Sequence, residues 1–285
     1  MRWLGGRESD NVDDRRGSSG GGMLVGGGIG TVVVAIIVML LGGDPSEILN
    51  QTAPSQATSQ QAPAGPQADD DAALFTSRVL ASTEDVWTKL FAEQGSQYPK
   101  PTLVMFRGAT SSGCGTAQQA MGPFYCPLDQ KVYIDLSFYD ELARRFNAPG
   151  DFAMAYVIAH EIGHHVQKQM GIMEKTDQLR QQMSKRDYNR VSVRLELQAD
   201  FFAGVWAHHA QGQSLALNDS DVESALTAAN AIGDDKIQEE TQGRVVPDAF
   251  THGTSAQRVY WFKKGLKTGD LSQGDTFNSR EDSNL

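Results

Sequence analysis

The stretch AYVIAHEIGHHVQKQMG, residues 155–171, places three of the chain's six histidines within six positions of an apolar, helix-patterned run. Apolar residues recur at helical spacing from Phe152 to Met170, which predicts one helix that begins near Asp151 and ends at Gly171. Ionisable side chains on a buried helix face are costly unless they are paired or bind a metal. The stretch therefore points to a metal site.

His160 and His164 stand at positions i and i+4, so both side chains project from one helix face and are near enough to bind the same ion. Glu161 lies about 100° around the helix, which suits a general base beside a metal-bound water. The same His-Glu-x-x-His pattern also arises by chance, and backbone groups or water can satisfy two such histidines. A third ligand is needed to decide between the two interpretations.

Two kinds of third ligand are known for this pattern. One is a histidine at position 170, but that position is Met170. The other is a carboxylate from a second helix, and the helix-patterned run NRVSVRLELQADFFAGVW, residues 189–206, carries Glu196 and Asp200 among packing residues. Pairing of these carboxylates with Arg194 or nearby lysines on a solvated face is the alternative. The apolar surroundings favour Glu196 as ligand, with Asp200 accepting the ring N–H of a ligating histidine.

Three segments precede the predicted domain. Residues 1–22 are polar and rich in glycine and serine, which predicts a disordered tail. Residues 23–43 carry no charged side chain, which predicts a transmembrane helix. A buried core helix or a cleaved signal peptide fits less well, because of the length, the flanks and the missing cleavage site. Residues 44–71 are rich in proline, glutamine, alanine and serine, which predicts a flexible linker.

Charge sets the predicted orientation and compartment. Arginines precede the apolar segment, whereas no lysine or arginine occurs between Asp44 and Ser77. We therefore expect a single-pass protein of a bacterial inner membrane, with a cytoplasmic N-terminus and a periplasmic or extracytoplasmic domain. In that compartment the only two cysteines, Cys114 and Cys126, are expected to form a disulfide, with two free thiols as the alternative. The net charge of −10 and the lack of a binding motif exclude nucleic acid as a partner.

Residues 72–278 form the predicted domain, followed by a short tail at 279–285. Helical patterns dominate it, and two β-rich runs, PTLVMFRG at 101–108 and KVYIDLSF at 131–138, read as strands. The combination predicts an α+β fold that is mainly helical and contains a small sheet.

The chain carries the motifs HEIGHH, ELQAD, GCG, MGPFYCP, VYIDLSFYD, GRVVPDAFTHGTSAQR and the opening MRW…RESDNVDDRR. Together these motifs make the chain similar to a known bacterial family, described as "putative neutral zinc metallopeptidases", which are membrane-anchored and of the gluzincin type. The resemblance covers nearly the whole chain outside the linker. It implies a zincin-like metallopeptidase domain with one zinc ion per chain, three ligands and one catalytic base, namely His160, His164, Glu196 and Glu161. The resemblance also implies a further cysteine pair in some relatives where this chain has Phe201 and Gly274, which puts a second disulfide in doubt here but not the chemistry.

The remaining histidines have separate predicted roles. His165 falls on the Glu161 side of its helix, so we expect it to contact a ligand or solvent rather than the metal. His208 and His209 end the second helix, where a cation suits the helix dipole, and are expected to be structural. For His252, which precedes a predicted helix, a backbone-capping role and a catalytic role both remain open.

Two functions fit these residues. In the first, a zinc-activated water hydrolyses peptide bonds in extracytoplasmic proteins or peptides, Glu161 transfers the proton, and His252 or Tyr133 stabilises the oxyanion. In the alternative, the chain is a membrane-tethered adaptor or chaperone that keeps a zincin-like fold without catalysis. Hydrolysis is favoured because a structural zinc prefers a closed shell of four ligands.

The strand KVYIDLSF is the predicted substrate edge, formed by Tyr133, Ile134 and Asp135. Its alternation would turn Ile134 inward and leave Tyr133 and Asp135 near the cleft. An extended substrate would pair its backbone with this edge, which predicts broad specificity for unfolded segments. The sequence identifies no membrane-protein partner.

Overall fold

The computed structural model describes residues 2–3, 6–17, 66–144, 151–231, 233–236, 238 and 244–278. The predicted transmembrane helix at residues 23–43, most of the predicted linker at 44–71 and the predicted tail at 279–285 lie outside these residues. Among the described residues, no helix is both long and apolar enough to cross a membrane.

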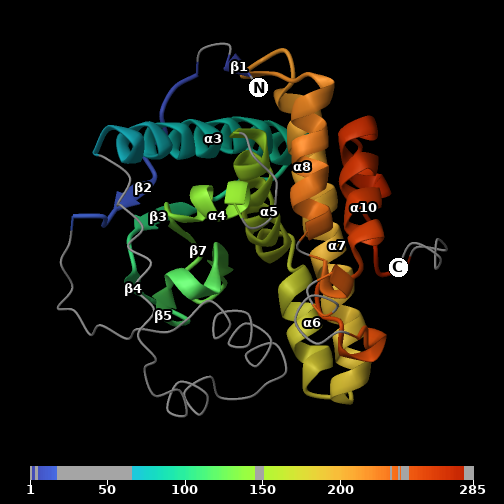
Figure 1. The fold of residues 1–285 in the computed structure, drawn as a ribbon. Coiled ribbons are helices and arrows are strands. Elements are labelled where there is room, and N and C mark those ends of the chain that lie inside the picture. Colours follow the sequence, from blue (N-terminus) through green and yellow to red (C-terminus); the bar gives the residue numbers. More distant parts are fainter. Residues whose placement is uncertain are drawn as a thin grey trace, which may run out of the picture.

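Helices form most of the described structure, as the hydrophobic periodicity predicts. They are α3 (Pro66–Glu93), α4 (Phe138–Arg144), α5 (Asp151–Gln169), α6 (Ile172–Arg180), α7 (Lys185–Ala210), α8 (Asp219–Ala231) and α10 (Ser255–Thr268), with 3-10 turns at Gln119–Met121, Pro247–Ala249 and Leu271–Gln273. Helix α5 packs on α3, α7 and α8, and α10 packs on α7 and α8 (Figure 1). Because α5 is enclosed on several sides, most of its side chains are buried.

The strands are few and short. They are β1 (Arg2–Trp3), β2 (Val12–Asp14), β3 (Thr102–Phe106), β4 (Ala109–Ser112), β5 (Gly115–Gln118), β6 (Phe124–Cys126), β7 (Lys131–Asp135) and β8 (Leu215–Ala216). One sheet has the order β2-β3-β7-β6, in which β3 runs parallel to β2 and β7, and β6 is antiparallel to β7. Strands β1 and β8 form one separate pair, and β4 and β5 another. The fold is thus mainly helical with a small sheet.

Residues 6–17 belong to this fold, so the prediction of a disordered tail is wrong for them. Val12 pairs with Leu103 in the sheet. Ser9 Oγ and Asn11 Nδ2 donate hydrogen bonds of 2.6 Å and 2.7 Å to the carboxylate of Glu84, which is fully buried on α3. The composition argument failed because charge-assisted hydrogen bonds, rather than a large apolar surface, hold this segment.

Helix α3 also begins earlier than predicted, at Pro66, so residues 66–71 are helical rather than part of a linker. Proline is common in the first turn of a helix, because its fixed φ suits the helix and its missing N–H has no helical acceptor there.

Helices α7 and α10 approach each other backbone to backbone. A Cβ on Gly204 would lie 2.2 Å from the carbonyl oxygen of Phe262, and one on Gly265 would lie 2.1 Å from that of Phe201. Only glycine allows this contact, which fixes the C-terminal half of α10 beside α7. A Cβ on Gly274 would lie 2.5 Å from Cδ1 of Phe201, so these two positions are neighbours and the Phe201 ring occupies the space between them.

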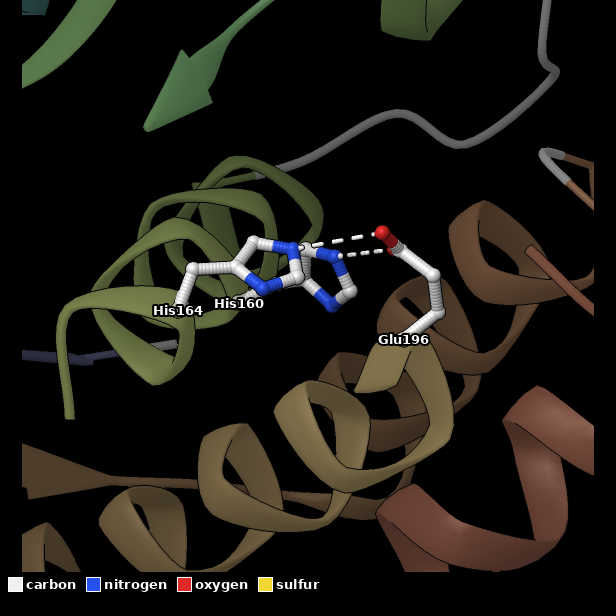
Figure 2. Close-up of side chains that lie close together, drawn as sticks. All are labelled: His160, His164 and Glu196. Atoms are coloured by element: carbon white, nitrogen blue, oxygen red, sulfur yellow. Dashed lines mark hydrogen bonds and ion pairs between the residues drawn. The ribbon is translucent and has the colours of Figure 1, made fainter. Parts of the chain in front are cut away.

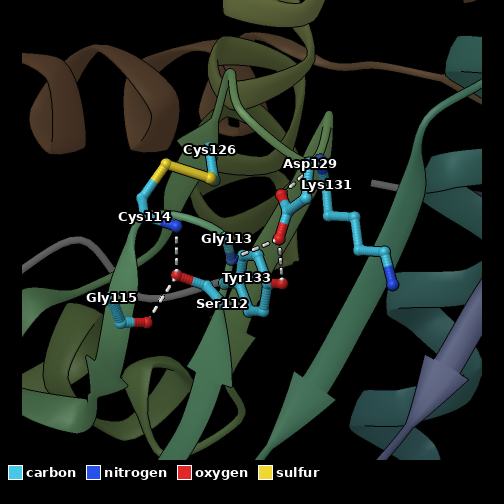
Figure 3. The surroundings of a disulfide bond; sticks show 8 residues. All are labelled: Ser112, Gly113, Cys114, Gly115, Cys126, Asp129, Lys131 and Tyr133. Atoms are coloured by element: carbon cyan, nitrogen blue, oxygen red, sulfur yellow. Dashed lines mark hydrogen bonds between the residues drawn. A yellow bond between two sulfur atoms is a disulfide. The ribbon is translucent and has the colours of Figure 1, made fainter.

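The predicted disulfide is confirmed. Cys114 and Cys126 are bonded with an S–S distance of 2.03 Å, which ties the β4–β5 hairpin to β6 (Figure 3). Asp129 reinforces this link, since its Oδ2 accepts hydrogen bonds from the Gly113 amide at 2.6 Å and from the Tyr133 hydroxyl at 2.7 Å. The hairpin is thereby fixed to the sheet at two places.

Strand β7 lies inside the sheet between β3 and β6, so the prediction that Tyr133, Ile134 and Asp135 form a substrate-binding edge is wrong. Ile134 is fully buried. Asp135 is also buried, and its carboxylate accepts hydrogen bonds from the Gly108 amide at 2.6 Å and the Ser137 hydroxyl at 2.7 Å. Alternation along a strand indicates its two faces but not its neighbours, which depend on residues far away in the sequence.

Candidate metal centre

Helices α5 and α7 carry three side chains that point toward one another (Figure 2). Nε2 of His160 lies 3.1 Å from Oε2 of Glu196, and Nε2 of His164 lies 3.5 Å from Oε1 of the same carboxylate. One ligand atom from each of the three residues lies within 4.8 Å of the others. The structure therefore brings the three predicted ligands together at one place.

Asp200 determines which ring nitrogen of His160 carries the proton. Nδ1 of His160 lies 2.8 Å from Oδ1 of Asp200, and because an ionised carboxylate only accepts, Nδ1–H donates this bond. In the neutral ring the other nitrogen, Nε2, then presents its lone pair toward Glu196.

Gln167 has the same effect on His164. Its amide nitrogen donates to the Leu195 carbonyl at 2.7 Å and to Oε1 of Gln198 at 3.1 Å, so its amide oxygen faces His164. Nδ1 of His164 lies 2.9 Å from that oxygen and must donate to it. The Nε2 lone pair of His164 is therefore directed at Glu196 as well.

Two imidazole lone pairs and a carboxylate thus converge, an arrangement that needs a cation or an added proton. Burial by itself lowers the pKa of His160, but Asp200 and Glu196 raise it to about 10. Burial raises the pKa of Glu196, but His164 and His252 outweigh this and hold it well below its usual range. The site therefore favours positive charge, and two imidazole nitrogens with one carboxylate are a donor set that suits zinc.

Gly163 allows α5 and α7 to lie close enough for this convergence. A Cβ at position 163 would lie 2.9 Å from the Ala199 carbonyl oxygen and 3.0 Å from the Ala199 Cα. Because position 163 carries no side chain, α5 and α7 come close enough for the two histidines of α5 to meet Glu196 and Asp200 of α7.

Glu161 is buried beside the two histidines. Burial raises its pKa, while the nearby imidazoles of His160 and His164 and a hydrogen bond with the Tyr125 backbone act in the opposite direction. A carboxyl with a raised pKa next to a metal site is suited to take up and release a proton.

A buried network behind the ligands holds Asp200 in place. Its Oδ1 accepts a hydrogen bond of 2.5 Å from the Tyr156 hydroxyl, and Arg258 donates to both carboxylate oxygens, from Nε at 2.9 Å and from Nη2 at 3.0 Å. Arg258 comes from α10. Burial lowers its pKa, but Asp200, Tyr156 and Glu196 together raise it well above its usual value. Three helices therefore contribute to the orientation of His160.

His252 lies in the loop before α10 and is oriented by Asp234. The Asp234 carboxylate accepts the backbone amides of Thr251 and His252 at 2.6 Å and that of Gly253 at 3.1 Å, and lies 3.3 Å from Nδ1 of His252. Burial lowers the pKa of His252, but the negative charges of Glu196 and Asp234 raise it above its ordinary value. The surroundings of His252 thus favour its protonated form near Glu196.

Comparison with known proteins agrees with this chemistry. Residues 1–277 match the family model described as "Putative neutral zinc metallopeptidase". The chain belongs to this family. It is similar to the "Uncharacterized protein YpfJ" of Escherichia coli K12, with 51% identity over 97% of this chain and 99% of the relative. It is also similar to the "Uncharacterized protein Rv2575" of Mycobacterium tuberculosis, with 41% identity over 72% of this chain and 71% of the relative. No solved structure is a significant match.

Other predicted residues of this zinc metallopeptidase family member lie away from the ligands. The Tyr133 hydroxyl bonds Asp129 beside the disulfide, so the prediction that it stabilises an oxyanion is not supported. His165 is buried between the Tyr125 hydroxyl at 3.1 Å and the Pro99 carbonyl at 2.7 Å, which excludes solvent as its main partner.

His208 and His209 tie α7 to the end of α10. Nδ1 of His208 lies 2.9 Å from the Leu266 carbonyl oxygen, and Nε2 of His209 lies 2.9 Å from that of Gly269. Both therefore have structural contacts.

Sequence reasoning missed Tyr156, Gln167 and Asp234. Tyr156 lies four residues before His160 and Gln167 three after His164, so helical spacing was a usable signal for both. The GDD run that contains Asp234 is far from His252 along the chain and gave no comparable signal.

Proposed function

We propose that the chain is a zinc-dependent endopeptidase that cleaves extended or unfolded segments of extracytoplasmic proteins and peptides. The observation that carries this proposal is the three-residue donor set of His160, His164 and Glu196 next to a buried carboxyl, Glu161. A purely structural zinc site prefers four protein ligands, whereas three ligands leave a position for water or substrate.

The residues present fit zinc, because two fixed Nε2 lone pairs face one carboxylate. When bound there, zinc acts as a Lewis acid that polarises the scissile carbonyl and lowers the pKa of a bound water. Glu161 accepts a proton from the attacking water and delivers it to the leaving amine. His252, which Asp234 orients and whose pKa is raised, stabilises in its protonated form the negative charge that develops on the carbonyl oxygen.

Strand β6 is the edge at which an extended substrate pairs in this proposal. Within the described sheet, β6 has a strand neighbour on one side only, and it packs on α5. The backbone of Tyr125, in β6, forms a hydrogen bond with Glu161, so this edge lies next to the proposed catalytic carboxyl. Recognition through backbone pairing depends on few side chains of the substrate, which accounts for broad specificity.

A location outside the cytoplasm is part of the proposal. The bond between Cys114 and Cys126 supports it, because disulfides persist in oxidising compartments. Residues 23–43 would attach the protein to the bacterial inner membrane, with the metal centre in the periplasm or outside the cell.

The deciding experiment compares Glu161→Gln with Glu93→Gln, a control at an exposed glutamate far from the ligands in sequence. Zinc content, measured by mass spectrometry, and cleavage of unfolded protein and peptide panels are determined on the same full-length preparations. Glu161→Gln should keep its zinc and lose cleavage by about a hundredfold or more, whereas Glu93→Gln should match the wild type.

Cleavage that persists in Glu161→Gln would refute the assigned base. A wild-type protein that binds zinc but cuts no member of the panels would favour the adaptor function instead.

A further inference from the structure

Residues 6–17 precede the apolar segment 23–43 in the chain but are built into the same fold as the metal centre. Strand β2 pairs with β3 in parallel over three residue pairs, Val12 to Asp14 against Leu103 to Met105. The Leu103 amide donates to the Asn11 carbonyl at 2.9 Å, and the Arg15 amide donates to the Met105 carbonyl at 2.8 Å. The pairing therefore extends beyond the strand at both ends.

Glu84 of α3 has most of its hydrogen-bond partners in residues 6–17. Its side chain is fully buried, and three groups from the N-terminal segment contact its carboxylate: Arg7 Nη2, Ser9 Oγ and Asn11 Nδ2, at 2.6, 2.6 and 2.7 Å. From the rest of the described chain, Lys100 Nζ approaches it to 3.8 Å. Without residues 6–17, the Glu84 carboxylate would lose most of its hydrogen-bond partners.

The sheet also needs the segment. Residues Leu103, Val104, Met105 and Phe106 of β3 are all buried. If β2 were absent, β3 would become an apolar edge with unpaired backbone groups, which proteins avoid because such edges aggregate. Arg15 adds contacts outside the strand pair, donating to the Thr110 hydroxyl at 3.2 Å and the Ser111 carbonyl at 3.0 Å.

The comparisons include these residues in the family. The family match begins at residue 1, and the Escherichia coli relative aligns with 97% of the chain. Residues 6–17 thus fall within the region that the family model matches.

A segment that crosses a bilayer once leaves its two flanks on opposite sides, whereas strands of one sheet are on the same side. We propose that residues 6–17 lie on the same side of the membrane as the metal centre. This replaces the predicted arrangement in which the N-terminus and the domain lie on opposite sides of the membrane, and it holds whether or not the protein is a peptidase.

Cysteine labelling of the full-length protein in its native membrane tests the proposal. Both native cysteines are in the disulfide, so the wild type provides a background control without a free thiol. Asp10→Cys reports on the N-terminal segment and Gln97→Cys on the domain, and both positions are exposed. A membrane-impermeant maleimide is added to spheroplasts before and after lysis.

The two introduced cysteines should be labelled at the same stage, either before or only after lysis. The ratio of their labelled fractions should be near one. Reaction of one before lysis and of the other only after lysis would overturn the proposal. Reaction of both only after lysis would support the shared side while contradicting the extracytoplasmic location proposed for the metal centre.

A second measurement tests the docking itself. Trypsin cuts after Arg15 and Arg16, whose side chains are 26% and 18% exposed in the docked segment. Glu84→Gln should increase the rate of this cleavage by about tenfold or more, since it removes the buried charge, whereas Asp85→Asn, at the exposed carboxylate that also contacts Arg7, should have little effect. Equal cleavage of the wild type and Glu84→Gln would contradict the docking.

Discussion

Asp200 accepts a hydrogen bond of 2.8 Å from Nδ1 of His160 and is held from the other side by Arg258. The carboxylate therefore connects a predicted zinc ligand on α5 to a cation on α10. Its role is to fix the tautomer and the direction of the imidazole, which is the function of carboxylate partners behind metal-binding histidines.

Metal content should separate ligands from their partners. His160→Ala, His164→Ala and Glu196→Ala should each lose most of the zinc, because each removes one of three donors. Asp200→Asn keeps all three donors and should weaken zinc affinity by about 10- to 100-fold. Titration with a competing chelator measures both effects, and full zinc occupancy in Glu196→Ala would disprove its assignment as a ligand.

Replacement of Asp234 should affect catalysis through His252. Asp234→Asn removes a charge that raises the pKa of His252, so the imidazole should lose its proton at a lower pH and the alkaline limb of kcat/KM should move in that direction. We expect kcat/KM at neutral pH to fall about tenfold or more, with zinc content unchanged. Asp235→Asn is the matched control, since Asp235 binds Ser255 rather than His252. An alkaline limb that stays in place would exclude this role for Asp234.

His165 should make the fold sensitive to acid. Burial lowers the pKa of His165 from 6.5 to about 4 in the folded protein. Between these pH values the unfolded chain takes up a proton that the folded chain does not, so stability is lost as the pH falls through this window, by about 3 kcal/mol in all. Urea unfolding of the wild type and of His165→Gln from pH 7 to pH 4 measures the difference. An unchanged slope in His165→Gln would contradict the prediction.

Gly163→Ala should be destabilising although alanine is the better helix former by about 1 kcal/mol. The new methyl group would meet the Ala199 backbone at 2.9 Å, which a packed helix pair relieves only by moving apart. Thermal unfolding should show a lower Tm, and zinc affinity should fall because the donors on α5 and α7 separate. A raised Tm with unchanged zinc affinity would show that the close contact is not needed.

The sequence was sufficient for the helices and for the convergence of His160, His164 and Glu196, because helical periodicity sets which residues share a face and an i, i+4 pair is a local feature. It was not sufficient for features that depend on distant partners. The neighbours of β7, the docking of residues 6–17 on Glu84 and the pairing of Asp234 with His252 all join segments that no local pattern relates.

The pairing of Val12 with Leu103 has a consequence for the order of folding. During synthesis the N-terminal residues emerge first, but their partner strand follows only about ninety residues later, and closing so long a loop is entropically unfavourable until other contacts form. The first part of the chain to be made is therefore among the last to join the sheet. Until it does, the carboxylate of Glu84 and the backbone of β3 remain available to water and to other chains.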